Sequence, residues 1–142
     1  MIPYLNLSRN WQTVESAGGP WTLMKKSGAD ANAFQISSMQ RQSGRKLDPE
    51  PNLLEFATQF AIRSGGVVTE SHVGDCVFGR YGTAIFKARE FKYCQCWTIT
   101  DGVHFIFATY VCDAVPDSNE LREVSAMAVS LKLIDDPSSK AN

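Results

Sequence analysis

Residues 93–112 constrain the fold most, because they hold two apolar runs, YCQCWTIT and VHFIFATYVC, separated by Asp101-Gly102. An Asp-Gly pair between β-prone runs is typical of a two-residue type I′ turn, since both turn positions need a positive φ that Gly adopts freely and Asp tolerates. The pattern therefore predicts a β-hairpin. A two-residue loop would place Trp97 opposite Ile106.

Both faces of this predicted hairpin are rich in apolar side chains. One face carries Phe91, Tyr93, Gln95, Trp97, Ile99, His104, Ile106, Ala108, Tyr110 and Cys112, and the other carries Cys94, Cys96, Thr98, Phe105, Phe107, Thr109 and Val111. Strands that are apolar on both sides are usually covered on both sides, by helices of the same chain or by another protein. The hairpin is therefore expected to be the structural centre of the domain.

Further strands are predicted on the N-terminal side of the hairpin. The runs 11–16 and 21–25 flank a Gly-Pro turn, and 33–40 alternates with Phe34 and Ile36 on one side. Residues 41–51 are polar and rich in Gly and Pro, which is typical of a loop.

Two helices and the remaining strands complete the expected pattern. Asn52 can cap a helix that Gly65-Gly66 would end, and Asp117 can cap a second helix whose apolar stripe ends at Leu131. Strands are expected at 67–73, 76–81 and 83–91, with a bulge or bend marked by Gly79 and Gly82.

This order of elements predicts an α+β fold, with a single antiparallel sheet of about six to seven strands packed with two helices. Short turns between neighbouring strands force antiparallel pairing, and the sequence has no βαβ unit with a glycine fingerprint. The 142 residues are the length of one domain. We expect a single domain over 1–142, with an ordered core of about 10–134 and a polar tail at 135–142.

Composition excludes some classes of function. The net charge of −1 and the scattered Lys and Arg residues give no basic patch for nucleic acid. The N-terminal residues show no cationic leader followed by a long apolar run, and no window approaches the ~18 apolar residues of a membrane span. A cytoplasmic protein is therefore expected, with neither nucleic acid nor membrane as a partner.

The four cysteines give the sequence its only candidate chemistry. Cys94 and Cys96 share a face of one strand, but the predicted alternation places His104 and Cys112 on the opposite face, which disfavours a zinc site. A cysteine nucleophile would need a nearby base such as His72 or His104. Buried free thiols are the favoured interpretation, so no catalytic, metal or cofactor residue is predicted, and a cysteine- or zinc-dependent enzyme is the competing class.

A pattern of four features resembles a known superfamily. Trp97 lies in the next-to-last predicted strand, the Asp101-Gly102 turn follows it, then come the apolar run 105–110 and a helix ending near Leu131. In this pattern, which covers about 11–134, the chain is similar to small bacterial proteins of the PsbP-like and DcrB-like superfamily. The resemblance implies an antiparallel sheet between helices and a non-enzymatic binding module, and some members act as chaperones or adaptors for type VI secretion effectors.

The sequence therefore predicts a non-catalytic protein-binding module. The favoured role is an immunity protein that neutralises a toxin; an effector chaperone is the alternative, and a homodimer is a further expected partner. Because two amphipathic helices can cover the hairpin, we expect partner contacts on loops and edges. The candidate contact residues are Arg41, Arg45, Lys46, Asp48, Glu50, Asp113, Asp117 and Glu120.

Overall fold

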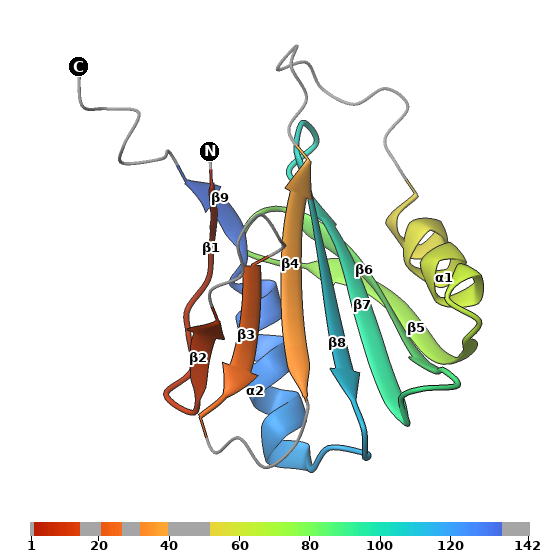
Figure 1. The fold of residues 1–142 in the computed structure, drawn as a ribbon. Helices are drawn as coiled ribbons and strands as arrows, with labels where there is room; N and C mark the ends of the chain where they lie inside the picture. The colour runs from red at the N-terminus through yellow and green to blue at the C-terminus, as the bar shows by residue number, and fades with distance from the viewer. Residues whose placement is uncertain (1, 15–20, 27–31, 40–51, 135–142) are drawn as a thin grey trace.

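The computed structural model describes residues 2–14, 21–26, 32–39 and 52–134 (Figure 1). In chain order its elements are β1 (Ile2–Tyr4), β2 (Trp11–Val14), β3 (Trp21–Lys25), β4 (Ala33–Met39), α1 (Leu53–Arg63), β5 (Val67–Asp75), β6 (Arg80–Lys87), β7 (Tyr93–Thr100), β8 (Phe105–Cys112), α2 (Ser118–Val129) and β9 (Lys132–Ile134). Seven strands form one sheet in the order β2-β3-β4-β8-β7-β6-β5, and β1 pairs with β9 in a second, two-stranded sheet. All of these pairings are antiparallel, so the predicted α+β fold is confirmed.

The central hairpin forms as predicted, but its register differs by two residues. Trp97 lies opposite Ala108, not Ile106, because the loop extends from Asp101 to His104. The Asp101 carboxylate accepts hydrogen bonds from the backbone N–H groups of Val103 at 2.8 Å and His104 at 2.7 Å, which stabilises the longer loop. A shift of two residues keeps every side chain of β7 and β8 on its face, so the faces predicted for these strands are correct. Phe91, which precedes β7, was predicted on the Trp97 face but packs with the cluster under α1.

The predicted strand at 76–81 is wrong. β5 continues to Asp75, and the chain turns at Cys76 and Gly79, whose backbone groups form hydrogen bonds in both directions, at 3.0 and 3.2 Å. Gly82 lies inside β6, where the absence of a side chain lets the sheet approach α1: a Cβ there would lie 2.5 Å from the carbonyl oxygen of Leu53. The bulge occurs in β5, where the register shifts between Val68 and Glu70.

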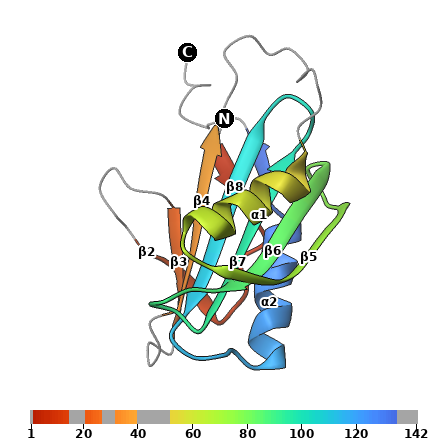
Figure 2. The same ribbon diagram turned by 90° about the vertical axis from the view of Figure 1, so that its right-hand side faces the viewer.

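The two helices cover opposite faces of the sheet (Figures 1 and 2). Both begin at the predicted caps: the Asn52 side chain accepts from the N–H of Glu55 at 3.0 Å, and that of Asp117 from the N–H of Glu120 at 2.8 Å. Neither of these two described helices is long and apolar enough to cross a membrane.

The largest buried cluster lies between α2 and the sheet. It includes Leu5, Trp11, Leu23, Phe34, Ile36, Trp97, Ile99, Ile106, Ala108, Tyr110, Cys112, Val124, Met127, Ala128, Leu131 and Leu133. Leu5 and Leu133 flank the β1–β9 pairing, which the sequence did not predict. The core therefore begins before residue 10, where the sequence analysis placed its start.

Candidate binding site

The α1 face of the sheet is covered over only part of its width. Helix α1 packs on β5, β6 and β7, and its edge reaches β8 through two aromatic contacts. The rings of Phe56 and Phe105 lie 5.9 Å apart, and those of Phe60 and Phe107 lie 4.7 Å apart. These four residues form a continuous aromatic strip, in which Phe56 is 53% exposed and the others are half-buried.

Beyond the aromatic strip, the same sheet face becomes polar. On β4 the side chains of Gln35 and Ser37 are exposed, and on β3 Thr22 and Met24 are half-buried. An antiparallel sheet with one packed and one solvated face usually shows this composition. The aromatic strip is therefore the boundary between the covered and the open halves of the face.

A cavity of about 330 Å³ opens at one end of the aromatic strip. Its walls come from the end of α1, the β6–β7 turn and the ends of β7 and β8. The lining residues are Phe60, Ser64, Phe86, Ala88, Arg89, Glu90, Phe91, Cys94, Gln95, Thr109, Tyr110 and Val111. This volume is at the lower end of the range for ligand pockets and is large enough for an apolar side chain of a partner.

The cavity is a poor place for covalent or acid–base chemistry. Burial raises the pKa of the Cys94 thiol in the cavity lining, so this thiol is protonated and weakly nucleophilic at neutral pH. Neither histidine lines the cavity: His72 lies 3.3 Å from the hydroxyl of Tyr81, and His104 lies 3.1 Å from the carboxylate of Asp101. The cavity lining therefore holds no pair of a cysteine and a histidine.

The other cysteines also lie in apolar surroundings. Burial raises the pKa of Cys96 to about 12, and its thiol donates to the carbonyl oxygen of Ala57 in α1 at 3.3 Å. Cys94 and Cys96 share the α1 face, whereas Cys112 lies on the α2 face, as predicted. Within the described ranges no disulfide joins any of the four cysteines, and no cluster of three or more His, Cys, Asp or Glu side chains is suited to a metal ion.

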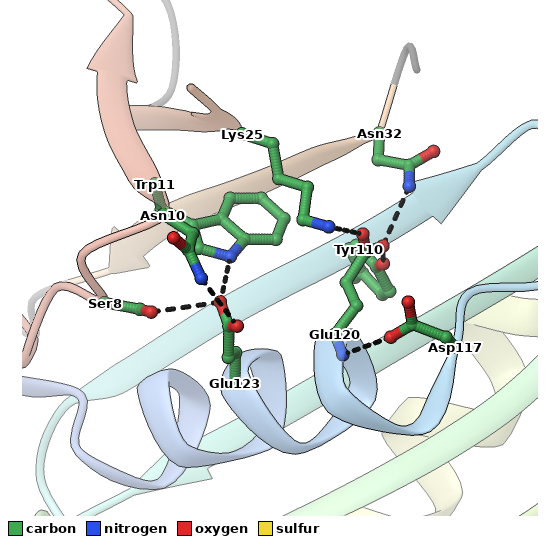
Figure 3. Close-up of polar contacts among 9 residues, drawn as sticks. All are labelled: Ser8, Asn10, Trp11, Lys25, Asn32, Tyr110, Asp117, Glu120 and Glu123. Carbon is green, nitrogen blue, oxygen red and sulfur yellow. Dashed lines mark hydrogen bonds and ion pairs between the residues drawn. The ribbon is translucent and has the colours of Figure 1, made fainter. Parts of the chain in front are cut away.

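On the opposite face, a buried carboxylate ties α2 to the sheet (Figure 3). Glu120 is only 4% exposed; it accepts from Asn32 at 2.8 Å and from the hydroxyl of Tyr110, and it pairs with Lys25 at 2.6 Å. The hydrogen bond to Glu120 raises the pKa of Lys25, although burial acts in the opposite direction. Charge-assisted bonds of this kind offset the cost of burying the carboxylate.

A second carboxylate of α2 ties the helix to the N-terminal segment. The side chains of Ser8, Asn10 and Trp11 each donate to Glu123 at 3.0 Å (Figure 3). Glu120 and Glu123 are three residues apart and therefore lie on one side of α2. Their inward orientation gives the α2 face a structural role.

Comparison with known proteins assigns the fold. No family model and no curated protein matches the sequence. The solution structure of cyanobacterial PsbP (CyanoP) from Synechocystis sp. PCC 6803 matches with a TM-score of 0.63 at 11% identity, over 94% of this chain and 92% of that chain. The fold is PsbP-like. At this identity the similarity shows the fold alone.

Within this PsbP-like fold, one of the residues predicted to contact a partner is not at the surface. Glu120 is buried and contacts Lys25 of β3, Asn32 just before β4 and Tyr110 of β8. It is therefore not part of an acidic surface; the sequence showed its helical spacing but not which strand would face it. Asp117 is exposed but caps α2, and Asp113 is exposed just after β8. The other five predicted residues, Arg41, Arg45, Lys46, Asp48 and Glu50, lie outside the described residues.

The sequence analysis set the aromatic surface of the hairpin aside as a candidate site, because two helices were expected to cover it. A local signal was present, because Phe56 and Phe60 have the i, i+4 spacing of one helix side, and Phe105 and Phe107 have the i, i+2 spacing of one strand face. What the sequence lacked was the position of α1, whose edge ends over β8. Because the edge of α1 ends over β8, the aromatic strip is left half-exposed.

Proposed function

We propose that this chain is a non-catalytic protein-binding module and that it contacts its partner with the aromatic strip and the adjoining cavity. The observation that carries the proposal is the exposure of Phe56, at 53%, next to the half-buried Phe105 and Phe107. Aromatic residues are enriched at the centres of protein interfaces, where they fill pockets and exclude water. The cavity at the end of the strip offers such a pocket for an apolar anchor from the partner.

In the favoured form of this proposal the partner is a toxin that the chain neutralises. Charged groups near the cavity support a protein ligand: Arg89 and Glu90 line it, and Asp113 lies two residues after the lining residue Val111. Charges at the rim of an interface steer association and select partners, while the apolar centre provides most of the affinity.

An effector chaperone is the second candidate, and one observation favours it. An immunity protein that blocks an active site is expected to present an acidic patch, but the predicted contact residue Glu120 turns inward, and so does its neighbour Glu123. A chaperone is expected to keep an apolar surface open, and the aromatic strip provides one. The two roles differ in what happens to the partner, so one experiment can separate them.

The experiment measures binding of this chain to the products of genes adjacent to its own, because toxins and effectors are usually encoded beside their partners. Phe56→Ser should weaken binding at least about tenfold, the effect of losing an interface anchor. The control is Ile62→Ser, which removes another exposed apolar side chain of α1, 62% exposed, and should leave affinity within about twofold.

Co-expression then assigns the role. An immunity protein should restore growth to cells that express the active toxin, and Phe56→Ser should abolish this protection. A chaperone should increase the yield of soluble effector without inhibiting it. If no neighbouring gene product binds, the proposed function is wrong. If both substitutions have the same effect on binding, the proposed site is wrong.

A further inference from the structure

The outer edge of β5 is an accessible pairing edge. β5 is the last strand of the seven-stranded sheet, and no described strand pairs with its outer side. It is nine residues long and mostly exposed, with Val67 at 71% and Val73 at 47%. Proteins usually protect such edges with short strands, Pro or Lys, but β5 contains neither residue and carries only a bulge near its start.

The opposite edge of the sheet differs in length. Its last strand, β2, has only four residues, and Trp11 at its start is fully buried. A short edge strand offers few backbone groups to another chain. If a strand is added to this sheet, β5 is therefore the favoured edge.

We propose that two copies of this chain pair through antiparallel β5 strands around a two-fold axis at Ser71, so that Glu70 of each copy lies opposite His72 of the other. Ser71 is the midpoint of β5 and lies after the bulge between Val68 and Glu70, so an axis there centres the overlap on the regular part of the strand. The pairing goes beyond the proposed partner-binding function, because it uses a different surface. An isologous contact of this kind is the commonest way in which proteins form dimers.

The side chains of Glu70 and His72 select this register. When a two-fold axis is perpendicular to a continuous sheet, each residue must lie opposite a residue on the same face, so the register can shift only in steps of two. A shift of two in one direction places Glu70 opposite its own copy, and a shift of two in the other places His72 opposite its own copy. Two carboxylates directly opposite are destabilising, and two opposing imidazoles lack a carboxylate acceptor, whereas Glu70 opposite His72 pairs a carboxylate with an imidazole.

The surroundings of the two residues are compatible with this pairing. Glu70 and His72 lie opposite Ile85 and Thr83 of β6, so their side chains are on the same sheet face, and both are exposed. The hydroxyl of Tyr81 lies 3.3 Å from Nε2 of His72, which leaves Nδ1 for a second hydrogen-bond partner. A carboxylate from the second copy can accept that hydrogen bond.

The pairing would place both partner-binding sites on the same side of the dimer. A two-fold axis perpendicular to the sheet keeps each α1 on the same face of the continuous sheet, so both aromatic strips face one direction. Two sites on one side allow a partner with two epitopes to bind both, which increases its apparent affinity.

Sedimentation equilibrium of the intact chain tests the dimer. We expect a concentration-dependent dimer, and Glu70→Lys or His72→Glu should each raise its dissociation constant at least about tenfold. An equimolar mixture of the two variants should form a heterodimer, because the introduced lysine then lies opposite the introduced glutamate. Glu55→Lys, an equal charge change at an exposed position of α1, is the control and should leave the dissociation constant unchanged.

Disulfide trapping tests the register. In a Cys76→Ser background, Ser71→Cys should form a covalent dimer under mild oxidation, since residues directly opposite in a strand pair have Cα atoms within disulfide reach. Val73→Cys should remain monomeric because its copy lies four residues away along the strand. A chain that stays monomeric up to about 1 mM, a dimer that is insensitive to Glu70→Lys, or equal trapping at both positions would overturn the proposal.

Discussion

The two faces of the central sheet are packed by different means. Against α2, the fully buried side chains are large, among them Trp11, Phe34 and Tyr110. Against α1 they are small: Ala57 and Ala61 of the helix meet Ala84 and Cys96 of the sheet. Large side chains hold α2 at a distance and fill the space between, whereas small ones let α1 approach the sheet closely. The α2 face should therefore be sensitive to lost atoms and the α1 face to added atoms.

Polar contacts reinforce this difference. α2 is tied to the N-terminal segments by the buried Glu120 and the partly buried Glu123, whose partners come from distant parts of the chain. α1 has fewer ties to the sheet, such as the hydrogen bond of 2.7 Å from the Thr98 hydroxyl to the carbonyl oxygen of Leu53. The α2 face is therefore the stable scaffold, and the α1 face is better suited to contact a partner.

Removing a large side chain from the α2 face should have the largest effect. Trp97 is 2% exposed, and its ring lies 5.6 Å from that of Phe34. Trp97→Ala should lower the free energy of unfolding by about 4 kcal/mol because it leaves a large cavity. Chemical denaturation measures this loss. The comparison is Phe105→Ala on the half-buried aromatic strip, and an equal loss there would show that the two faces are not packed differently.

Removing the cation of the buried pair should have the next largest effect. Lys25→Met leaves the Glu120 carboxylate without its ion-pair partner and should cost about 3 kcal/mol. The neighbouring Lys26, which is exposed, provides the control as Lys26→Met and should change the free energy of unfolding by less than about 0.5 kcal/mol.

The same pair predicts a dependence of stability on pH. The pKa of Lys25 is raised in the folded state, so its contribution is complete below the ordinary lysine value of about 10.4 and is lost as pH rises through the folded-state pKa. The difference in unfolding free energy between the parent chain and Lys25→Met should therefore shrink above about pH 10. A constant difference across that range would mean that Lys25 does not stabilise the fold through its charge.

Adding an atom to the α1 face should have an intermediate effect. At Gly82 a Cβ would lie 2.5 Å from the backbone of Leu53, so Gly82→Ala should displace α1 and cost about 2 kcal/mol. Because the Cys96 thiol lies under α1, the displacement should also accelerate its alkylation, which mass spectrometry measures. The exposed change Ser71→Ala in β5 should leave the alkylation rate unchanged. A slow rate in Gly82→Ala would contradict close packing of α1.

The smallest effect is expected in the loop between β7 and β8, which is part of neither helix–sheet interface. Asp101→Ala removes the acceptor for the N–H groups of Val103 and His104 and should cost about 1 kcal/mol, the usual size of a lost capping interaction. Burial alone would raise the pKa of Asp101, but these N–H groups and the His104 ring outweigh it and lower the pKa. This stabilisation should therefore decline as pH falls through the folded-state pKa, below the ordinary value of about 3.9.

Local patterns were sufficient to predict much of this fold. Alternation placed Trp97 and Tyr110 on one face of the hairpin and Cys94 on the other, and those faces are correct even though the register moved by two residues. Asn52 and Asp117 marked the starts of the two helices. Such signals were readable because periodicity and capping depend on residues only a few positions apart.

The candidate site and the buried network depended on contacts between distant segments. The sequence alone determined the two helices, the central hairpin with the faces of its strands, and the antiparallel class. Only the tertiary structure decided that β4 lies beside β8, that Glu120 turns inward to Lys25, Asn32 and Tyr110, and that α1 stops at the aromatic strip. The physical reason is that the burial or exposure of a side chain depends on which distant segment packs against it. Local periodicity shows which residues share a face, but it does not show which segment covers that face.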